Sequence, residues 1–142
     1  MRKLSKKLTV GILSAMPEEL GSTIDNLESL EKSKYGALEI YTGNWQGSNS
    51  LPFEIKIITA WSGWGKVSAA RAATRLIGLN LKSIPKISLI IFNGVAGSVN
   101  SNLNQWDIVI ASQLIQHDMD ARPIFSRYTI PEIGRAHVWT PV

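Results

Sequence analysis

Two adjacent glutamates, Glu18 and Glu19, stand where an apolar strand candidate ends and a helix candidate begins. In open α/β sheets, ligands bind at the carboxyl ends of strands, and a helix N-terminus there commonly attracts an anion such as phosphate. Here the chain's own carboxylates occupy that place, which favours a base acting on water. Neighbouring helical positions point about 100° apart, so we expect one carboxylate to face the crevice and the other solvent. The alternative is that both only complement the helix dipole.

Two glycine-containing segments follow other strand candidates. In residues 60–67, Gly63 and Gly65 would let the backbone approach a ligand closely. The spacing is too short for a phosphate loop, and Lys66 is either an anion contact or a solvated side chain. In residues 92–98, small residues would allow a flat base or sugar to lie against the main chain, although for this segment alone a tight turn is the favoured interpretation. We expect the three strand ends to converge on one crevice.

A third cluster, His117 with Asp118 and Asp120, has the residue types of a metal site. Metal sites normally need three or four converging ligands, and the only other histidine, His137, lies in an unusual C-terminal tail. The sequence therefore predicts no metal. The chain has no cysteine, so disulfides and thiolate ligands are excluded, and no Ser/His/Asp set for nucleophilic catalysis can be assembled.

The composition indicates one globular domain with a substantial core. The chain has 142 residues, of which 44% are hydrophobic and 18% charged, and its net charge is +4. Positive charge is concentrated before the first strand, and no basic stripe alternates with aromatic residues, so we expect no nucleic-acid partner. No apolar run approaches the roughly 20 residues of a membrane-spanning helix. The sequence predicts a cytoplasmic protein with no membrane partner.

Hydrophobic patterning predicts five strands, over 8–14, 38–42, 53–60, 87–93 and 107–112. The first, fourth and fifth are near-continuous apolar runs, typical of strands covered on both faces. The second and third alternate more, and the loop over 43–50 is of the hairpin type.

Two helices are expected to position the candidate site. The first begins at Pro17 and carries Leu20, Ile24 and Leu27 on one face. The second spans about 65–79. Its inward side chains are expected to be Val67, Ala70, Thr74 and Ile77, and its outward ones Arg71 and Arg75. Alternation of strands and helices predicts an α/β fold with a mainly parallel sheet.

The last ten residues, 133–142, break the pattern. They resemble a translation of a common short-read sequencing adapter, in which Trp139 stands at a TGA codon read as tryptophan. An unusual native tail is the alternative. On the adapter interpretation, the native sequence continues past about residue 132, and this chain is its N-terminal part.

Taken together, the segments resemble the 5′-methylthioadenosine/S-adenosylhomocysteine nucleosidases of the nucleoside phosphorylase superfamily. The matching segments keep family order and spacing across roughly residues 8–125: 11–19, 62–67, 93–97, 107–109 and 117–120. The resemblance implies a three-layer α/β/α fold with a mixed, mainly parallel central sheet. Residues 1–132 would be the N-terminal part of a single such domain, incomplete at its C-terminus.

The resemblance also implies an activity, namely hydrolysis of the N-glycosidic bond of methylthioadenosine and S-adenosylhomocysteine with release of adenine. Glu19 would activate the water, Met16 would pack near the ribose, and Trp64 would lie near the 5′ substituent. Val95, Ala96 and Gly97 would line the adenine and ribose pocket. No cofactor or metal is implied, the partner is a small nucleoside, and the full-length protein would be a homodimer.

Three departures from the family pattern bear on activity. Trp64 replaces a smaller aliphatic residue and Val95 replaces a common serine. The family's ribose-binding Met-Glu pair and purine-protonating aspartate belong to its C-terminal half, so we expect this chain alone to be nearly inactive. Phosphorolysis is an alternative, but the glycine-aspartate-proline-x-arginine motif of the phosphorylases is missing and an anionic Glu19 would repel phosphate. The chain could also be a nucleoside-binding fragment without turnover.

Overall fold

The computed structural model describes residues 6–47, 53–79 and 86–129. The chain forms two compact units, Met1–Gly97 and Ser98–Val142. Within the described residues, all regular secondary structure lies in the first unit. Its elements in chain order are β1 (Lys6–Ser14), α1 (Pro17–Leu20), the 3₁₀ helix η1 (Gly21–Thr23), β2 (Leu27–Tyr35), β3 (Leu38–Trp45), β4 (Phe53–Trp61), α2 (Lys66–Ile77) and β5 (Leu89–Phe92).

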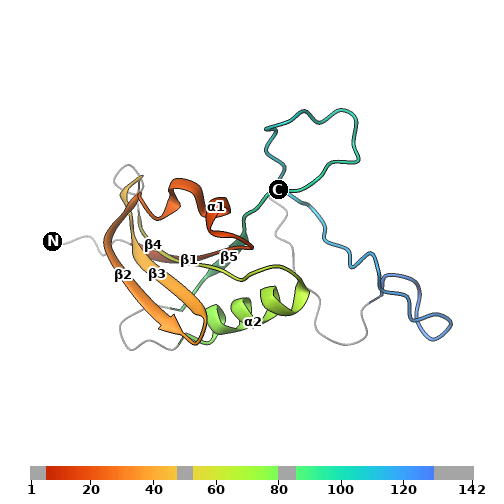
Figure 1. Cartoon of the computed structure of the whole chain (residues 1–142), viewed down its shortest axis with the longest axis horizontal. Coiled ribbons are helices and arrows are strands. Elements are labelled where there is room, and N and C mark those ends of the chain that lie inside the picture. Colours follow the sequence, from red (N-terminus) through yellow and green to blue (C-terminus); the bar gives the residue numbers. More distant parts are fainter. Residues whose placement is uncertain (1–5, 48–52, 80–85, 130–142) are drawn as a thin grey trace. The chain divides into compact units, whose positions relative to one another are not determined.

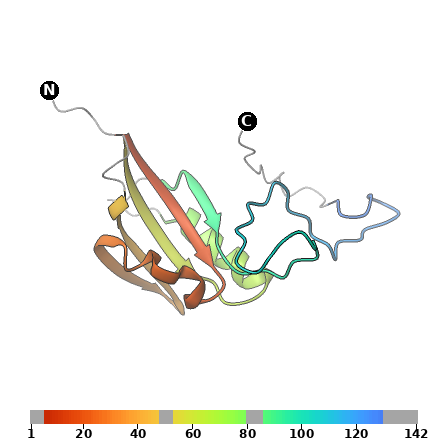
Figure 2. The ribbon, with the colours of Figure 1, turned by 90° about the horizontal axis from the view of Figure 1, so that it is seen from above.

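The strands form one mixed five-stranded sheet in the order β2-β3-β4-β1-β5. β1 pairs in parallel with both β4 and β5, whereas β3 is antiparallel to β2 and β4. Figure 1 shows α1 and α2 on opposite sides of this sheet, and Figure 2 shows the common direction of β1, β4 and β5. The mixed sheet is confirmed, but parallel and antiparallel pairings are equally represented, so the expected parallel majority is not seen in the described residues.

The sheet carries an apolar cluster on each face, because alternate strand residues point to opposite sides. On the α2 face, Leu13, Ile58 and Ala60 pack with Ala72 and Leu76 of the helix. A second, smaller cluster is built from Val10, Leu27 and Ile57. β1 therefore contributes to both clusters, and its carboxyl end is held in a fixed place.

The buried face of α2 differs from the expected one. Ala72 and Leu76 are fully buried, whereas Val67 and Ile77 are 85% and 70% exposed. Ala70 and Thr74, also expected to point inward, are exposed, while Arg71 and Arg75 are exposed as predicted. The small alanines allow the helix to lie close to the sheet, and this contact decides the orientation over the larger residues.

The first helix is much shorter than predicted. It ends at Leu20 because Gly21 adopts a positive φ of 51°, a conformation that breaks the helical path. Leu27, expected on the helix, is instead the buried first residue of β2. The helical spacing of Leu20, Ile24 and Leu27 was misleading, because these residues belong to the end of α1, a turn and the start of β2.

Two apolar strand candidates are less covered than expected. β5 forms, but at the edge of the sheet, and its Leu89 and Phe92 are 47% and 60% exposed. The predicted strand over 107–112 is wrong for this structure: these residues form no strand, and Ile108 and Ile110 are largely exposed. An apolar segment becomes a strand only where a neighbour accepts its hydrogen bonds, and no pairing with the described strands involves it.

Over the described ranges, no helix is long and apolar enough to cross a membrane. The tail over 133–142 lies outside the described residues.

Candidate functional site

Three strand ends meet at one edge of the sheet, as the sequence predicted. Backbone hydrogen bonds join the end of β1 to the segments that leave β4 and β5. Their donors and acceptors are Ser62 N–H to the Ser14 carbonyl (2.8 Å), Gly63 N–H to the Ala15 carbonyl (3.1 Å) and Asn93 N–H to the Leu13 carbonyl (2.9 Å). The carboxyl end of β1 is thus fixed from both sides.

Glu19 is the charged group at this junction. It is the third residue of α1, so its side chain can reach back over the start of the helix, as in a capping box. Its Oε2 accepts hydrogen bonds from the N–H groups of Ala15 (2.8 Å) and Met16 (3.2 Å). Its Oε1 accepts one from the N–H of Val95 (3.1 Å), beyond the end of β5. The last bond is not part of a helix cap, because its donor lies 76 residues away in the chain.

These three donors favour the ionised form of Glu19. The Val95 N–H holds the pKa of the Glu19 carboxyl below its ordinary value, and the Ala15 and Met16 N–H groups act in the same direction. Partial burial opposes them by disfavouring the charge. A carboxylate offers about four acceptor positions, so three described donors leave Glu19 able to accept a hydrogen bond from water. Its neighbour Glu18 is exposed to solvent.

Gly94 makes room for the carboxylate. A Cβ at this position would lie 2.9 Å from Glu19 Oε1 and 3.2 Å from Oε2, closer than van der Waals contact. The lack of a side chain at Gly94 therefore allows the β5 loop to approach Glu19 closely enough for the Val95 bond.

The remaining predicted residues occupy the same three strand ends. Met16 is half-buried and uses its N–H on Glu19. Trp64 is 78% exposed and Val95 81% exposed, and Ala96 and Gly97 are exposed too. Only Val95 and Met16 are in direct hydrogen-bond contact with Glu19 among the predicted binding residues, and no described contact joins Trp64, Ala96 or Gly97 to it.

Sequence reasoning did not assign a role to Asn93. Its side-chain amide donates to the backbone carbonyl of Glu19 at 2.7 Å. The available signal was an amide side chain directly after the apolar run of β5.

The histidine cluster belongs to the second unit, Ser98–Val142. No group of three or more His, Cys, Asp or Glu side chains able to hold a metal occurs among the described residues. Asp120 is bound by the guanidinium of Arg122 through Nε (2.8 Å) and Nη2, which lowers the pKa of Asp120. Asp120 is therefore paired with Arg122 at the surface of the second unit.

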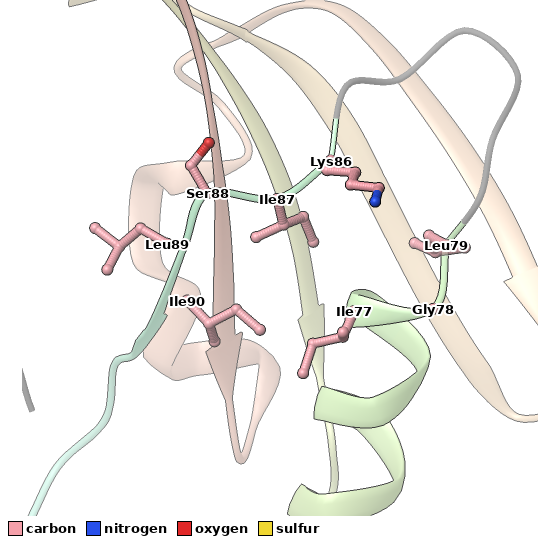
Figure 3. A pocket seen from close by; sticks show the side chains of 8 residues that line it. All are labelled: Ile77, Gly78, Leu79, Lys86, Ile87, Ser88, Leu89 and Ile90. Carbon is pink, nitrogen blue, oxygen red and sulfur yellow. The ribbon is translucent and has the colours of Figure 1, made fainter. Parts of the chain in front are cut away.

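Two cavities lie away from Glu19. One, of about 500 Å³, is bordered by Ile77 at the end of α2 and by Ile87 and Ile90 (Figure 3). The other, of about 630 Å³, lies beside Tyr35 and Arg75. The predicted site residues line neither cavity.

The chain belongs to the phosphorylase superfamily, whose sequence profile matches residues 9–139. A 5′-methylthioadenosine/S-adenosylhomocysteine nucleosidase of Desulfotalea psychrophila is 37% identical over 114 residues, which are 80% of this chain and 44% of that protein. The resemblance to these nucleosidases is thereby confirmed.

Solved structures of related proteins share the fold. The S-adenosylhomocysteine nucleosidase of Streptococcus pyogenes, in complex with 5-methylthiotubericidin, superposes with a TM-score of 0.75 at 29% identity, over 89% of this chain and 49% of that one. A futalosine hydrolase of Helicobacter pylori superposes with a TM-score of 0.69 at 30% identity, over 88% and 49%. The chain spans about half the length of the relatives it matches.

Proposed function

We propose that this sequence is the water-activating part of a nucleosidase that hydrolyses the N-glycosidic bond of 5′-methylthioadenosine and S-adenosylhomocysteine and releases adenine. The single observation that carries the proposal is the Glu19 carboxylate, held by N–H donors from two strand ends with acceptor capacity left for water. The oxygen of water bonds to the anomeric carbon as the bond from that carbon to adenine breaks through an oxocarbenium-like transition state. Glu19 takes a proton from the attacking water, and the purine-protonating aspartate that the resemblance places in the C-terminal half gives a proton to the leaving adenine. General acid–base catalysis of this kind contributes about 10²–10⁴-fold.

Hydrolysis is favoured over phosphorolysis by the charge at the same position. The N–H donors that could have bound phosphate at the start of α1 are already engaged by Glu19 Oε2. A phosphate placed there would meet a carboxylate of the same sign. Water, which is neutral and donates hydrogen bonds, suits this environment better.

Substrate contacts form the second part of the proposal. Met16 packs near the ribose, Trp64 lies near the 5′ substituent, and Val95, Ala96 and Gly97 line the base and ribose pocket. Their support is their position at the three converging strand ends. The homodimeric state, the three-layer α/β/α form of the whole domain and its placement in the cytoplasm are expectations from the same family resemblance.

Adenine release is the direct test. A longer gene product that contains this sequence, and the present chain alone, are assayed on methylthioadenosine, S-adenosylhomocysteine and futalosine, with and without phosphate. We expect phosphate-independent release by the longer protein from the two adenine nucleosides and almost none by this chain. Release that requires phosphate would establish phosphorolysis, cleavage of futalosine alone would reassign the substrate, and binding without release would indicate a nucleoside-binding module.

Glu19→Gln and Glu18→Gln form a matched pair in the longer protein. The first removes the carboxylate that accepts three N–H bonds, and the second removes an exposed neighbouring charge. We expect Glu19→Gln to lose about 10²–10⁴-fold in kcat and Glu18→Gln to remain close to the parent. Equal activity of the two variants would show that Glu19 is not the base.

A further inference from the structure

The end of β5 holds Glu19 at two separate points. Asn93 donates its side-chain amide to the backbone carbonyl of Glu19 at 2.7 Å. Two residues further along, the Val95 N–H donates to Oε1 of the same glutamate at 3.1 Å. One short loop therefore binds both the main chain and the carboxylate of Glu19.

Asn93 is also fixed to the sheet. Its own N–H donates to the carbonyl of Leu13 at 2.9 Å, at the end of β1. With its main chain on β1 and its side chain on α1, Asn93 sets where the next residues of the loop must run. Gly94 comes next and has no side chain. It passes so close to Glu19 that a Cβ on Gly94 would lie only 2.9 Å from Glu19 Oε1.

The orientation of the Asn93 amide is defined by its partner. A backbone carbonyl can only accept, so the side chain must present Nδ2 rather than Oδ1 to Glu19. A side chain of similar size without a donor cannot make this bond. The contact thus depends on the chemistry of asparagine and not only on its volume.

We propose that Asn93 is a positioning residue for Glu19: by tying the β5 loop to the α1 backbone, it holds the Val95 N–H against the carboxylate and selects one side-chain conformation of the glutamate. Its importance for catalysis rests on the proposed function, whereas its effect on Glu19 is a property of this chain alone. The bond from the Asn93 side chain to the Glu19 carbonyl keeps the Val95 N–H within hydrogen-bonding distance of Glu19 Oε1.

The test is an NMR titration of the present chain with ¹³C-labelled glutamate and ¹⁵N-labelled backbone. In the parent, the Glu19 carboxyl resonance and the Val95 amide proton should titrate together, since the hydrogen bond couples them. In Asn93→Ala and Asn93→Leu we expect the Glu19 midpoint to rise toward the ordinary glutamate value and the Val95 amide proton to lose its titration. Using two variants of different size separates loss of the donor from loss of volume.

Asn26→Ala is the matched control. Asn26 also donates its side-chain amide to a backbone carbonyl, that of Ser22, at 2.8 Å, but it has no described contact with Glu19. We expect this variant to leave both titrations unchanged. Unchanged titrations in folded Asn93→Ala and Asn93→Leu would overturn the proposal, and so would failure of both to fold, which would make Asn93 a residue of the fold. If the titrations shift as expected while Glu19→Gln retains hydrolysis in the longer protein, the positioning stands and the proposed base is wrong.

Discussion

Replacement of Gly94 by alanine should displace the Glu19 carboxylate while leaving the fold stable. The new Cβ would lie 2.9 Å from Oε1, 3.1 Å from Cδ and 3.2 Å from Oε2 of Glu19. All three atoms belong to the far end of a flexible side chain, which can move away. Gly43→Ala offers the opposite case, because its Cβ would lie 2.7 Å from Leu27 Cβ and 2.9 Å from the backbone oxygen of Glu28, atoms fixed by strand pairing.

The two substitutions differ in what must give way. To restore ordinary contact at Gly94, the carboxylate must recede by about half an ångström, which lengthens its 3.1 Å bond to Val95 N–H to roughly 3.6 Å, beyond hydrogen-bonding range. The loss of that bond, in contact with solvent, is about 1 kcal/mol, and the reduced freedom of the unfolded chain offsets about 0.4–1 kcal/mol. In Gly43→Ala the contacted atoms of Leu27 and Glu28 cannot move away in this manner, and overpacking lowers the free energy of unfolding by about 1–3 kcal/mol.

Urea unfolding of both variants of this chain checks the difference. We expect the free energy of unfolding of Gly94→Ala to lie within about 1 kcal/mol of the parent, and that of Gly43→Ala to be lower by about 1–3 kcal/mol. Under the proposed function, Gly94→Ala in the longer protein should also reduce kcat by up to about 10²-fold, because the displaced Glu19 carboxylate would be misaligned with the attacking water. Equal destabilisation by the two variants, or unchanged kcat in Gly94→Ala, would refute the reasoning.

Three further predictions concern charge, buried hydroxyls and the helix face. Because folding lowers the pKa of Glu19, the stabilising contribution of this carboxylate is present above its pKa in the unfolded chain and is lost as the pH falls through its pKa in the folded chain. Urea unfolding from about pH 7 to pH 3 should therefore show the free energies of unfolding of the parent and Glu19→Gln converging as the pH falls. A difference that stays constant with pH would contradict this prediction. Thr9 is buried and its hydroxyl has no partner among the described residues, so Thr9→Val should raise the free energy of unfolding by about 1 kcal/mol, whereas a loss would point to an unseen partner. Leu76→Ala should lower the free energy of unfolding by about 2–5 kcal/mol and Ile77→Ala by less than about 0.5 kcal/mol, because these side chains are 0% and 70% exposed. Thermal or urea unfolding measures both values, and the reverse order would support the helix face expected from the sequence, with Ile77 inward.

Strand prediction from sequence succeeded where the apolar pattern had one explanation. β1, β3, β4 and β5 form near their expected positions, because runs such as residues 8–14 have neither the length nor the breaks of a helix. β2 was missed because its only buried residue is Leu27 and the rest of it is largely polar. The sequence of α2 offers two apolar faces, one with Ala72 and Leu76 and one with Val67 and Ile77. Only packing against the sheet determines that the first of these faces is buried.

The candidate site was predictable in its location but not in its contacts. A glutamate at a strand end beside a helix start is visible in sequence, and so is the convergence of strand ends. The bond from Val95 to Glu19 spans 76 residues, and no local pattern predicts which N–H will meet which oxygen. Asn93 was missed for the same reason, since its partner is a backbone carbonyl that carries no sequence signal.

All three described donors to the Glu19 carboxylate are backbone N–H groups, of Ala15, Met16 and Val95. The ionisation of the Glu19 carboxyl therefore depends on the course of the main chain and not on the identity of these side chains. Substitutions that preserve this course can change the side chains at these positions without removing the hydrogen bonds to Glu19. Under the proposed function, directed evolution of substrate preference can accordingly begin at Met16 and Val95, with Glu19, Asn93 and Gly94 kept unchanged.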